Sequence, residues 1–430
     1  MSISPARIAA YDVLLRIERD RAFSAVLLPE YEAGLNEKDR ALCHQLVLGV
    51  LRRKFYLDTA ISKFSGEKKI DLEVLIALRL GAYQLLELNR IPQHSAVNES
   101  VSLAQRARKT SAKGFVNAIL RRISKEGFRL ELSDPADRLS IETSHPTWLI
   151  KRWGGQFGDE RASSIAAASN RPPRTAIRLT SNGKQRGTNL PEYCRESEIV
   201  SGAFIADAST SGLRELSDKG EVYFQDEASQ LIAREIKLPA GEKFLDVCAA
   251  PGGKTALVAD INSGNGVQFF AGDLYKKRVE FLRENCRRQG SGGINVLQYD
   301  AERAMPFAAE SFDAILVDAP CSGTGTISSN PEIRYFLQPE NILALQKKQL
   351  AILGNSAGLL RRGGRLYYST CSLEREENED VIAEFLSEFE EFSALPICVD
   401  RRFRTEAGFG RTFPDRDGTD GFFFAILGRS

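Results

Sequence analysis

Two cysteines in the C-terminal half of the chain have the surroundings of reactive thiols. Cys321 lies in the stretch Asp-Ala-Pro-Cys-Ser-Gly-Thr-Gly (318–325), and Cys371 lies in Ser-Thr-Cys-Ser (369–372). Each stretch follows an apolar run of the kind that forms a buried parallel strand. The ligand crevice of an open α/β sheet lies beyond the carboxyl ends of such strands. We therefore expect both thiols, and Asp318 beside one of them, to face one crevice.

A third loop, Asp-Val-Cys-Ala-Ala-Pro-Gly-Gly-Lys-Thr (246–255), joins a predicted strand to a predicted helix. Paired glycines let a ligand approach the backbone, and a helix N-terminus favours negative groups. The alternative interpretation is a nucleotide-binding P-loop. That motif requires glycine where Cys248 stands, and Pro251 lacks the N–H that a phosphate cradle uses. The run that ends at Asp318 could still serve as the metal-binding strand of such an NTPase, so this alternative stays open.

Four aspartates follow successive predicted strands: Asp246, Asp273, Asp300 and Asp318. A carboxylate after the second strand is the usual partner of ribose hydroxyls in nucleoside-binding sheets. Any one of the four could be a helix cap. As a series with the glycine loop they predict a site for an adenosine that carries a cationic centre, a description that S-adenosylmethionine meets.

Residues from about 222 to 427 resemble the RNA cytosine-C5 methyltransferase family. Three stretches carry the resemblance: 246–255, 318–325 and 368–372, the last followed by Glu377 and Asn378. The family implies S-adenosylmethionine as cofactor and Cys371 as the nucleophile, with Cys321 acting in product release. It also implies that Asp318 binds the cytosine N3/N4 edge, while Lys254 lowers a thiol pKa or contacts the base. The cofactor-binding residues it implies are Cys248, Ala249, Ala250, Pro251, Gly252, Gly253, Lys254, Asp273, Arg278, Asp300 and Asp318.

The chemistry explains why two thiols are needed. C5 of cytosine is a poor nucleophile until a thiolate adds to C6 and turns the ring into an enamine-like species. The methylated adduct must then lose its C5 proton and expel the thiol, which requires a base. A base inside a duplex cannot present C6 to a thiolate, so the target cytosine is single-stranded or flipped out.

Residues 1–130 are predicted to be all-helical and are basic, with 22 Lys or Arg against 14 Asp or Glu, whereas the remainder carries a net charge of −7. The region resembles the NusB-like RNA-binding bundle, chiefly in Pro92–Glu99 and Lys113–Arg122. The resemblance implies RNA contacts on the basic face. Charge alone equally allows a solvated helical surface. The candidate RNA-binding residues are Arg106, Arg108, Lys109, Lys113, Arg121 and Arg122.

The complete expected architecture is an α/β protein with three parts. A NusB-like helical domain (1–130) and a small α+β connector (131–222) precede a Rossmann-like, S-adenosylmethionine-dependent methyltransferase sheet (223–430), in which strands alternate with helices. The bundle narrows the resemblance to the bacterial ribosomal RNA branch of the family, so 16S ribosomal RNA is the expected partner. Transfer RNA as substrate, and a non-catalytic RNA-binding or antitermination module, remain alternatives.

The cysteine content and the apolar runs of the sequence limit the possible classes of protein. Seven cysteines and three histidines form no zinc-binding pattern, and an odd number of cysteines favours free thiols. The sequence has no apolar run of membrane-spanning length, and Met1–Arg7 lacks the core of a signal peptide. We therefore expect a cytoplasmic protein without metal or membrane contacts, and a monomer by default. Cys248, Cys286 and Cys398 are expected to be buried small hydrophobes.

Overall fold

The computed structural model describes residues 3–66, 69–207 and 211–430, so Met1 and Ser2 of the N-terminal stretch lie outside the described residues. The chain divides into two compact units. Unit 1 comprises the chain up to Arg171 together with the segment Ile327–Leu337. Unit 2 comprises Pro172–Thr326 and Gln338–Ser430. The finer division at residues 130 and 222 stays a prediction.

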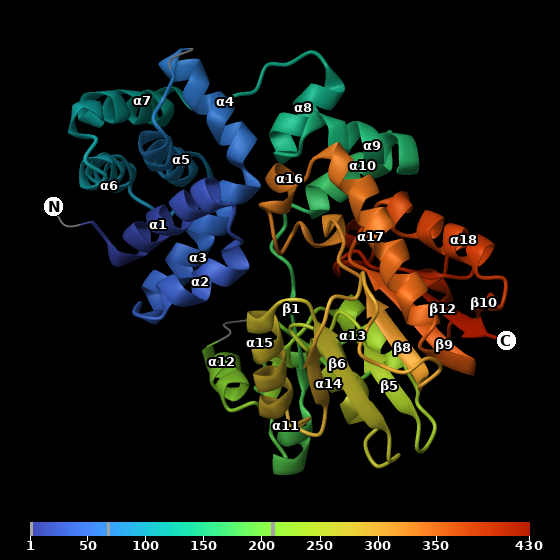
Figure 1. Cartoon of the computed structure of the whole chain (residues 1–430). Helices are drawn as coiled ribbons and strands as arrows, with labels where there is room; N and C mark the ends of the chain where they lie inside the picture. Colours follow the sequence, from blue (N-terminus) through green and yellow to red (C-terminus); the bar gives the residue numbers. More distant parts are fainter. Residues whose placement is uncertain (1–2, 67–68, 208–210) are drawn as a thin grey trace. The chain divides into compact units, whose positions relative to one another are not determined.

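Unit 1 is built from helices (Figure 1). Its elements are α1 (Pro5–Asp20), α2 (Ser24–Glu32), α3 (Glu37–Arg52), α4 (Lys54–Ser65), α5 (Leu72–Glu87), α6 (Gln93–Arg106), a 3₁₀ turn (Thr110–Ala112), α7 (Lys113–Glu126), α8 (Pro135–Thr143), α9 (Thr147–Phe157), α10 (Asp159–Ala168) and α16 (Ile333–Phe336). Pro5 occupies the first turn of α1, and the Asn36 side chain accepts a hydrogen bond from the backbone N–H of Asp39 at the start of α3. Helix α5 is apolar on most sides and lies in the core of α1–α7. The all-helical prediction for residues 4–130 is confirmed.

The segment Ile327–Leu337 is part of unit 1 although it is flanked in sequence by unit 2. The fully buried Arg334 guanidinium donates hydrogen bonds to Thr143 O (2.8 Å), Asn170 Oδ1 (2.7 Å) and Ser169 O (3.2 Å). The Glu332 carboxylate accepts bonds from the backbone and hydroxyl of Ser24. These contacts satisfy buried polar groups of unit 1, so the segment is a structural member of that unit.

Unit 2 begins with a small antiparallel sheet of strand order β2-β3-β1-β4. Its elements are β1 (Thr175–Leu179), α11 (Ser181–Arg186), β2 (Cys194–Glu196), β3 (Ala203–Ala206), α12 (Ser211–Asp218) and β4 (Val222–Phe224). The sequence Thr175–Thr180 itself predicts a short strand, and β1 confirms it. The expected connector is divided between the units, because α8–α10 belong to unit 1 and these strands to unit 2.

The main sheet of unit 2 has strand order β10-β12-β9-β8-β5-β6-β7, and β11 pairs with β12. Its strands are β5 (Lys243–Asp246), β6 (Gln268–Asp273), β7 (Asn295–Gln298), β8 (Phe312–Asp318), β9 (Leu360–Thr370), β10 (Phe392–Leu395), β11 (Gly410–Arg411) and β12 (Phe423–Arg429). The five strands β5–β9 run parallel, whereas β12 pairs antiparallel with both β9 and β10. The predicted Rossmann-like sheet is confirmed, with an antiparallel edge added.

Helices cover both faces of this sheet. They are α13 (Glu227–Glu235), α14 (Gly253–Ile261), α15 (Lys276–Arg288), α17 (Pro339–Ala357), α18 (Glu379–Glu388) and α19 (Pro414–Asp417), with 3₁₀ turns at Thr324–Thr326, Arg375–Glu377 and Arg401–Phe403. Leu245 and Ile315 pack with α17 and α18, while Phe244 and Leu316 pack with α13 and α14 on the other face. Adjacent residues of a strand point to opposite faces, which explains why both strands are apolar throughout.

Two helix ends and one strand differ from what the sequence predicts. The sequence pattern predicts a helix from Glu340 to Leu360, but α17 ends at Ala357, since Leu360 already belongs to β9. The pattern predicts the next helix from Glu376, but α18 begins at Glu379 after a 3₁₀ turn. Strand β10 was not predicted; its central residues Ser393 and Ala394 are exposed, so its apolar pattern is weak. In the described part of the chain no helix is long and apolar enough to cross a bilayer.

Candidate active site

The two predicted thiols meet at the carboxyl edge of the main sheet. Strands β8 and β9 are neighbours, with Asp318 directly opposite Ser369, so the loops that follow them run side by side. The Sγ atoms of Cys321 and Cys371 lie 3.2 Å apart, and both residues are half-buried free thiols. The predicted shared crevice is therefore present, and both sulfur atoms can reach one small ligand.

Asp318 is held from two sides. Lys254 Nζ lies 2.8 Å from Asp318 Oδ2, and the Ser369 hydroxyl donates to Oδ1 at 2.6 Å. The ammonium of Lys254 also lies 4.8 Å from the centre of the Phe422 ring, a cation–π contact. Burial alone would lower the pKa of Lys254, but the neighbouring Asp318 carboxylate raises it instead. Lys254 is thus a fixed cation that orients Asp318 beside the thiols.

The surroundings of Cys321 hold its thiol in the protonated form. The hydrogen bond to Cys371 and then burial raise the pKa of Cys321 well above the ordinary value for a thiol. Cys321 therefore keeps its proton at neutral pH. A protonated Cys321 can donate its S–H to the sulfur of Cys371, 3.2 Å away.

Asp246, at the end of β5, is buried. Its Oδ2 accepts a 2.6 Å hydrogen bond from the Thr255 hydroxyl in the first turn of α14, while its Oδ1 has no partner among the described residues. Burial raises the pKa of Asp246 to about 7, and the bond from Thr255 opposes this rise. A buried carboxylate oxygen without a partner indicates a place where a ligand or a water can donate.

A cavity of about 360 Å³ opens beside the thiols, the volume of a small-molecule site. The predicted residues that line it are Cys248, Ala250, Asp273, Arg278, Asp300, Asp318, Cys321 and Cys371. The predicted residues that do not line it are Ala249, Pro251, Gly252, Gly253 and Lys254. The sheet edge therefore brings together both cysteines and three of the four strand-end aspartates, with the fourth, Asp246, buried behind them.

Arg278 explains how the second aspartate is held. Its guanidinium lies 3.0 Å from an Asp273 carboxylate oxygen and also donates to Ala250 O at 3.0 Å. The backbone N–H of Ala250 in turn donates to Asp273 at 3.3 Å. Hydrogen bonds and an ion pair thus connect the loop after β5 to both Asp273 and Arg278. Asp300 contacts Arg303 at 3.4 Å and caps the N–H of Glu302.

The paired glycines have a packing role that the sequence analysis did not predict. Gly252 has φ +99°, and a Cβ there would lie 2.8 Å from Leu282 Cδ1. A Cβ on Gly253 would lie 2.8 Å from the Tyr223 ring. Both positions exclude a side chain because α15 and β4 approach closely. We predicted that a ligand approaches the backbone of these two glycines. Neither of them lines the cavity.

Several residues of the site were missed. Tyr275, Tyr299, Lys348 and Ile352 line the cavity. The exposed Tyr275 follows the end of β6 by two residues and the buried Tyr299 follows β7 by one, so their position after strands was a readable signal. Ser369 was missed because strand register, which pairs it with Asp318, cannot be read locally.

The predicted RNA-binding residues of unit 1 fall into two groups. Arg106 forms two bonds to Asp12 (2.7 and 2.8 Å), and Lys109 and Arg122 also have carboxylate partners. Arg121 donates to Asn117 Oδ1 at 3.1 Å and has no carboxylate partner among the described residues. Arg108 and Lys113 are exposed and pair with no described residue. The cations free to meet a phosphate are thus fewer than the sequence indicates.

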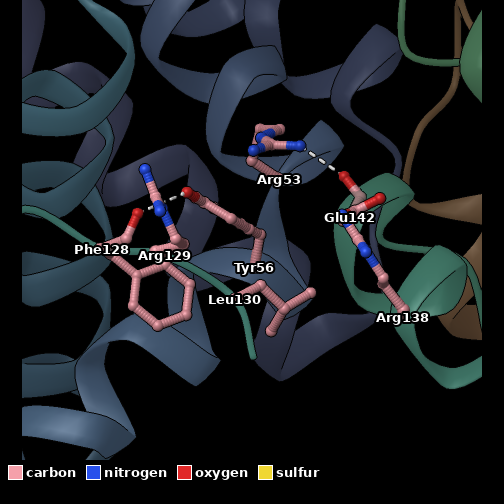
Figure 2. A pocket seen from close by; sticks show the side chains of 7 residues that line it. All are labelled: Arg53, Tyr56, Phe128, Arg129, Leu130, Arg138 and Glu142. Carbon is pink, nitrogen blue, oxygen red and sulfur yellow. Dashed lines mark hydrogen bonds and ion pairs between the residues drawn. The ribbon is translucent and has the colours of Figure 1, made fainter. Parts of the chain in front are cut away.

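Unit 1 also contains a pocket that no motif indicated (Figure 2). Arg53 lies 4.0 Å from the Tyr56 ring centre, bonds to the backbone oxygen of Glu142 and pairs with Glu87, and Arg138 pairs with Glu142. These arginines already have acceptors, and no thiol lines the pocket. The pocket therefore lacks the reactive groups found at the sheet edge.

The remaining cysteines differ from one another. Cys286 is buried as predicted, whereas Cys248 is only half-buried and lines the cavity. The prediction for Cys398 was wrong, since it is exposed in the loop after β10. No group of histidine, cysteine and acidic side chains in the described ranges is arranged to hold a metal ion.

The chain is similar to known proteins along its whole length. Residues 234–428 match the family described as 16S rRNA methyltransferase RsmB/F, and residues 4–125 match the NusB family. The chain is 35% identical to a probable ribosomal RNA small subunit methyltransferase B of Bacillus subtilis, over 99% of both chains. It is 32% identical to ribosomal RNA small subunit methyltransferase B of Pseudomonas putida, over 98% of both. The solved structure of PH0851 has a TM-score of 0.84 and 25% identity, and the match covers both chains fully.

Proposed function

The chain belongs to the 16S rRNA methyltransferase RsmB/F family, and on this premise we propose that it methylates C5 of a cytosine in 16S ribosomal RNA. The observation that carries the proposal is the 3.2 Å separation of the Cys321 and Cys371 sulfur atoms beside Asp318. Methylation at a ring nitrogen or a ribose oxygen needs no thiol, because those atoms are already nucleophilic. Methylation at C5 needs one thiol to activate the ring and a base to restore it.

The cavity residues fit S-adenosylmethionine. Asp273 and Asp300 line it and supply acceptors for ribose hydroxyls and an adenine amine, and Asp246 has a buried oxygen without a described partner. A set of carboxylates suits a cationic ligand better than a polyphosphate. When bound, this cofactor supplies an electrophilic methyl group. The fit disfavours the NTPase alternative.

Cys371 adds to C6 of the cytosine in the first step. Its thiolate forms the S–C6 bond, and the electron pair of the C5–C6 bond becomes available at C5 for the methyl group. The S–H of Cys321 stabilises that thiolate beforehand. In this proposal Asp318 holds the N3/N4 edge of the base as charge develops; its bonds to Lys254 and Ser369, which orient it beside the thiols, support this role.

Adduct formation then prepares the release step. Once Cys371 is a thioether, it no longer accepts a strong hydrogen bond from Cys321, and the first cause of the raised Cys321 pKa is removed. Cys321 can then release its proton to solvent, and the resulting thiolate removes the proton from C5. The electron pair of that C–H bond reforms the C5–C6 double bond, and the sulfur of Cys371 leaves. At the end of the cycle Cys321 is again a thiol and Cys371 is again a thiolate.

Trapping of the covalent adduct tests this assignment. Cys321→Ala should accumulate protein that stays bound to RNA on a denaturing gel, whereas Cys371→Ala should show none. Nuclease digestion of RNA treated with the wild-type protein should yield 5-methylcytosine. Equal adduct formation by the two variants, or the reverse pattern, contradicts the roles. Methylation of transfer RNA but not of 16S RNA contradicts the substrate, and no methyl transfer to either favours a binding module.

A further inference from the structure

A buried carboxylate that the chemistry above does not use lies beneath both cysteine loops. Glu377 follows β9 and is completely buried. Its Oε1 accepts the backbone N–H of Ser322 at 2.8 Å and Gln349 Nε2 at 3.0 Å. Its Oε2 accepts the hydroxyls of Ser322 and Ser372. One side chain therefore binds the residue directly after Cys321 and the residue directly after Cys371.

The surrounding contacts make this bridge rigid. Gln349 of α17 also donates to Pro320 O at 3.0 Å, on the other side of Cys321. Asn378, next to Glu377, donates to Ser372 O at 2.9 Å and accepts from the Thr370 hydroxyl at 2.5 Å. Both residues that flank Cys371 are thus held by Asn378, as those flanking Cys321 are held by Glu377 and Gln349. Each cysteine therefore lies in a loop whose flanking residues are fixed by hydrogen bonds.

We propose that Glu377 is a positioning residue that fixes the separation of the Cys321 and Cys371 sulfur atoms. The inference deepens the proposed function and rests on it for its role in methyl transfer. Four donors converge on the carboxylate, and only an ionised side chain accepts all four. Burial raises the pKa of Glu377, while the bonds from Ser322 and Ser372 oppose that rise. An amide in its place must turn its N–H₂ group toward the Ser322 and Ser372 hydroxyls, which then accept instead of donating. Two charge-assisted bonds become weaker neutral ones, so the two loops are held less firmly.

The sharpest test measures sulfur proximity without RNA or cofactor. The full-length wild type and Glu377→Gln are treated with the thiol oxidant diamide, and the peptide that links Cys321 to Cys371 is quantified by mass spectrometry. We expect the variant to form this disulfide more slowly by roughly tenfold or more, since a displacement of about 1 Å at a site can change a rate by up to a hundredfold. Glu227→Gln is the matched control: Glu227 is equally buried in unit 2 and accepts from Ser197, away from both cysteine loops.

Methyl transfer supplies the second measurement. Glu377→Gln should lower kcat by roughly the same factor while KM for S-adenosylmethionine stays within about twofold of wild type. Disulfide formation at the wild-type rate in a folded Glu377→Gln protein overturns the inference. If that variant does not fold, Ser322→Ala and Ser372→Ala replace it, and wild-type rates in both overturn the inference equally. Slow disulfide formation together with no cytosine-C5 methylation by the wild type contradicts the proposed function but leaves the positioning role intact.

Discussion

The buried carboxylate of Asp246 makes the stability of unit 2 depend on pH in a calculable way. Its pKa rises from 3.8 to about 7 on folding, because burial disfavours the charged form. Between these values the native state binds more protons than the unfolded state, so the free energy of unfolding falls as pH rises. The loss is absent below pH 4 and complete just above pH 7.

The size of the effect follows from the shift. Each pKa unit corresponds to about 1.4 kcal/mol, so the ionised side chain costs unit 2 on the order of 4 kcal/mol at pH 8. Asp246→Asn removes the titration while an amide can still bond to Thr255. The variant should match the wild type near pH 4 and exceed it in stability by about 4 kcal/mol at pH 8.

Hydrogen exchange of peptides from β5 and β8 is the appropriate assay, because it reports the opening free energy of this sheet alone. Tryptophan fluorescence is unsuitable, since both tryptophans lie in α9 of unit 1. Thr255→Val supplies an internal check: it removes the bond that lowers the Asp246 pKa, so the pH window should move upward. A stability difference between Asp246→Asn and wild type that is the same at pH 4 and pH 8 would refute the reasoning.

Three further outcomes are expected. Gly252→Ala should lower the melting temperature of unit 2 at a cost of about 1–3 kcal/mol, because φ is +99° and the new methyl meets Leu282; an unchanged melting temperature contradicts the strained backbone. Arg334→Ala should destabilise unit 1 by roughly 3 kcal/mol, seen by tryptophan fluorescence, since it removes three hydrogen bonds and leaves Ser169 O and Asn170 Oδ1 without this donor; a loss under about 0.5 kcal/mol contradicts this. Arg108→Ala should weaken 16S RNA binding and reduce its salt dependence more than Arg106→Ala, whose guanidinium is already paired; equal effects in a filter-binding titration contradict the division of the basic face.

The sequence patterns predicted the positions of the two cysteines better than they predicted the packing contacts around them. Apolar runs that end in Cys321 and Cys371 predicted neighbouring strand ends, and the parallel register of β8 and β9 confirms that prediction. The reason is that strand alternation and the carboxyl-edge rule act over short stretches of chain. The functions of these residues stay predictions, since proximity does not show reactivity.

What the sequence did not reveal depends on contacts between distant segments. The role of Gly252 is set by α15, whose Leu282 packs against it. The pairing of Arg106 with Asp12 joins α6 to α1 and neutralises a cation that looked free. In the sequence Glu377 is recognisable only as part of a motif. Its role as a bridge could not be predicted, because its four donors come from three separate segments. Local periodicity carries no information about such convergence.

The membership of Ile327–Leu337 in unit 1 has a consequence for biosynthesis. A ribosome releases the helices up to Arg171 long before this segment, and β5–β8 must be made in between. Until the segment emerges, the backbone oxygens of Thr143 and Ser169 have no Arg334 to donate to them. The first unit therefore completes its fold only after most of the second has been synthesised. A truncated chain that ends at residue 171 would model an assembly intermediate, not a finished domain.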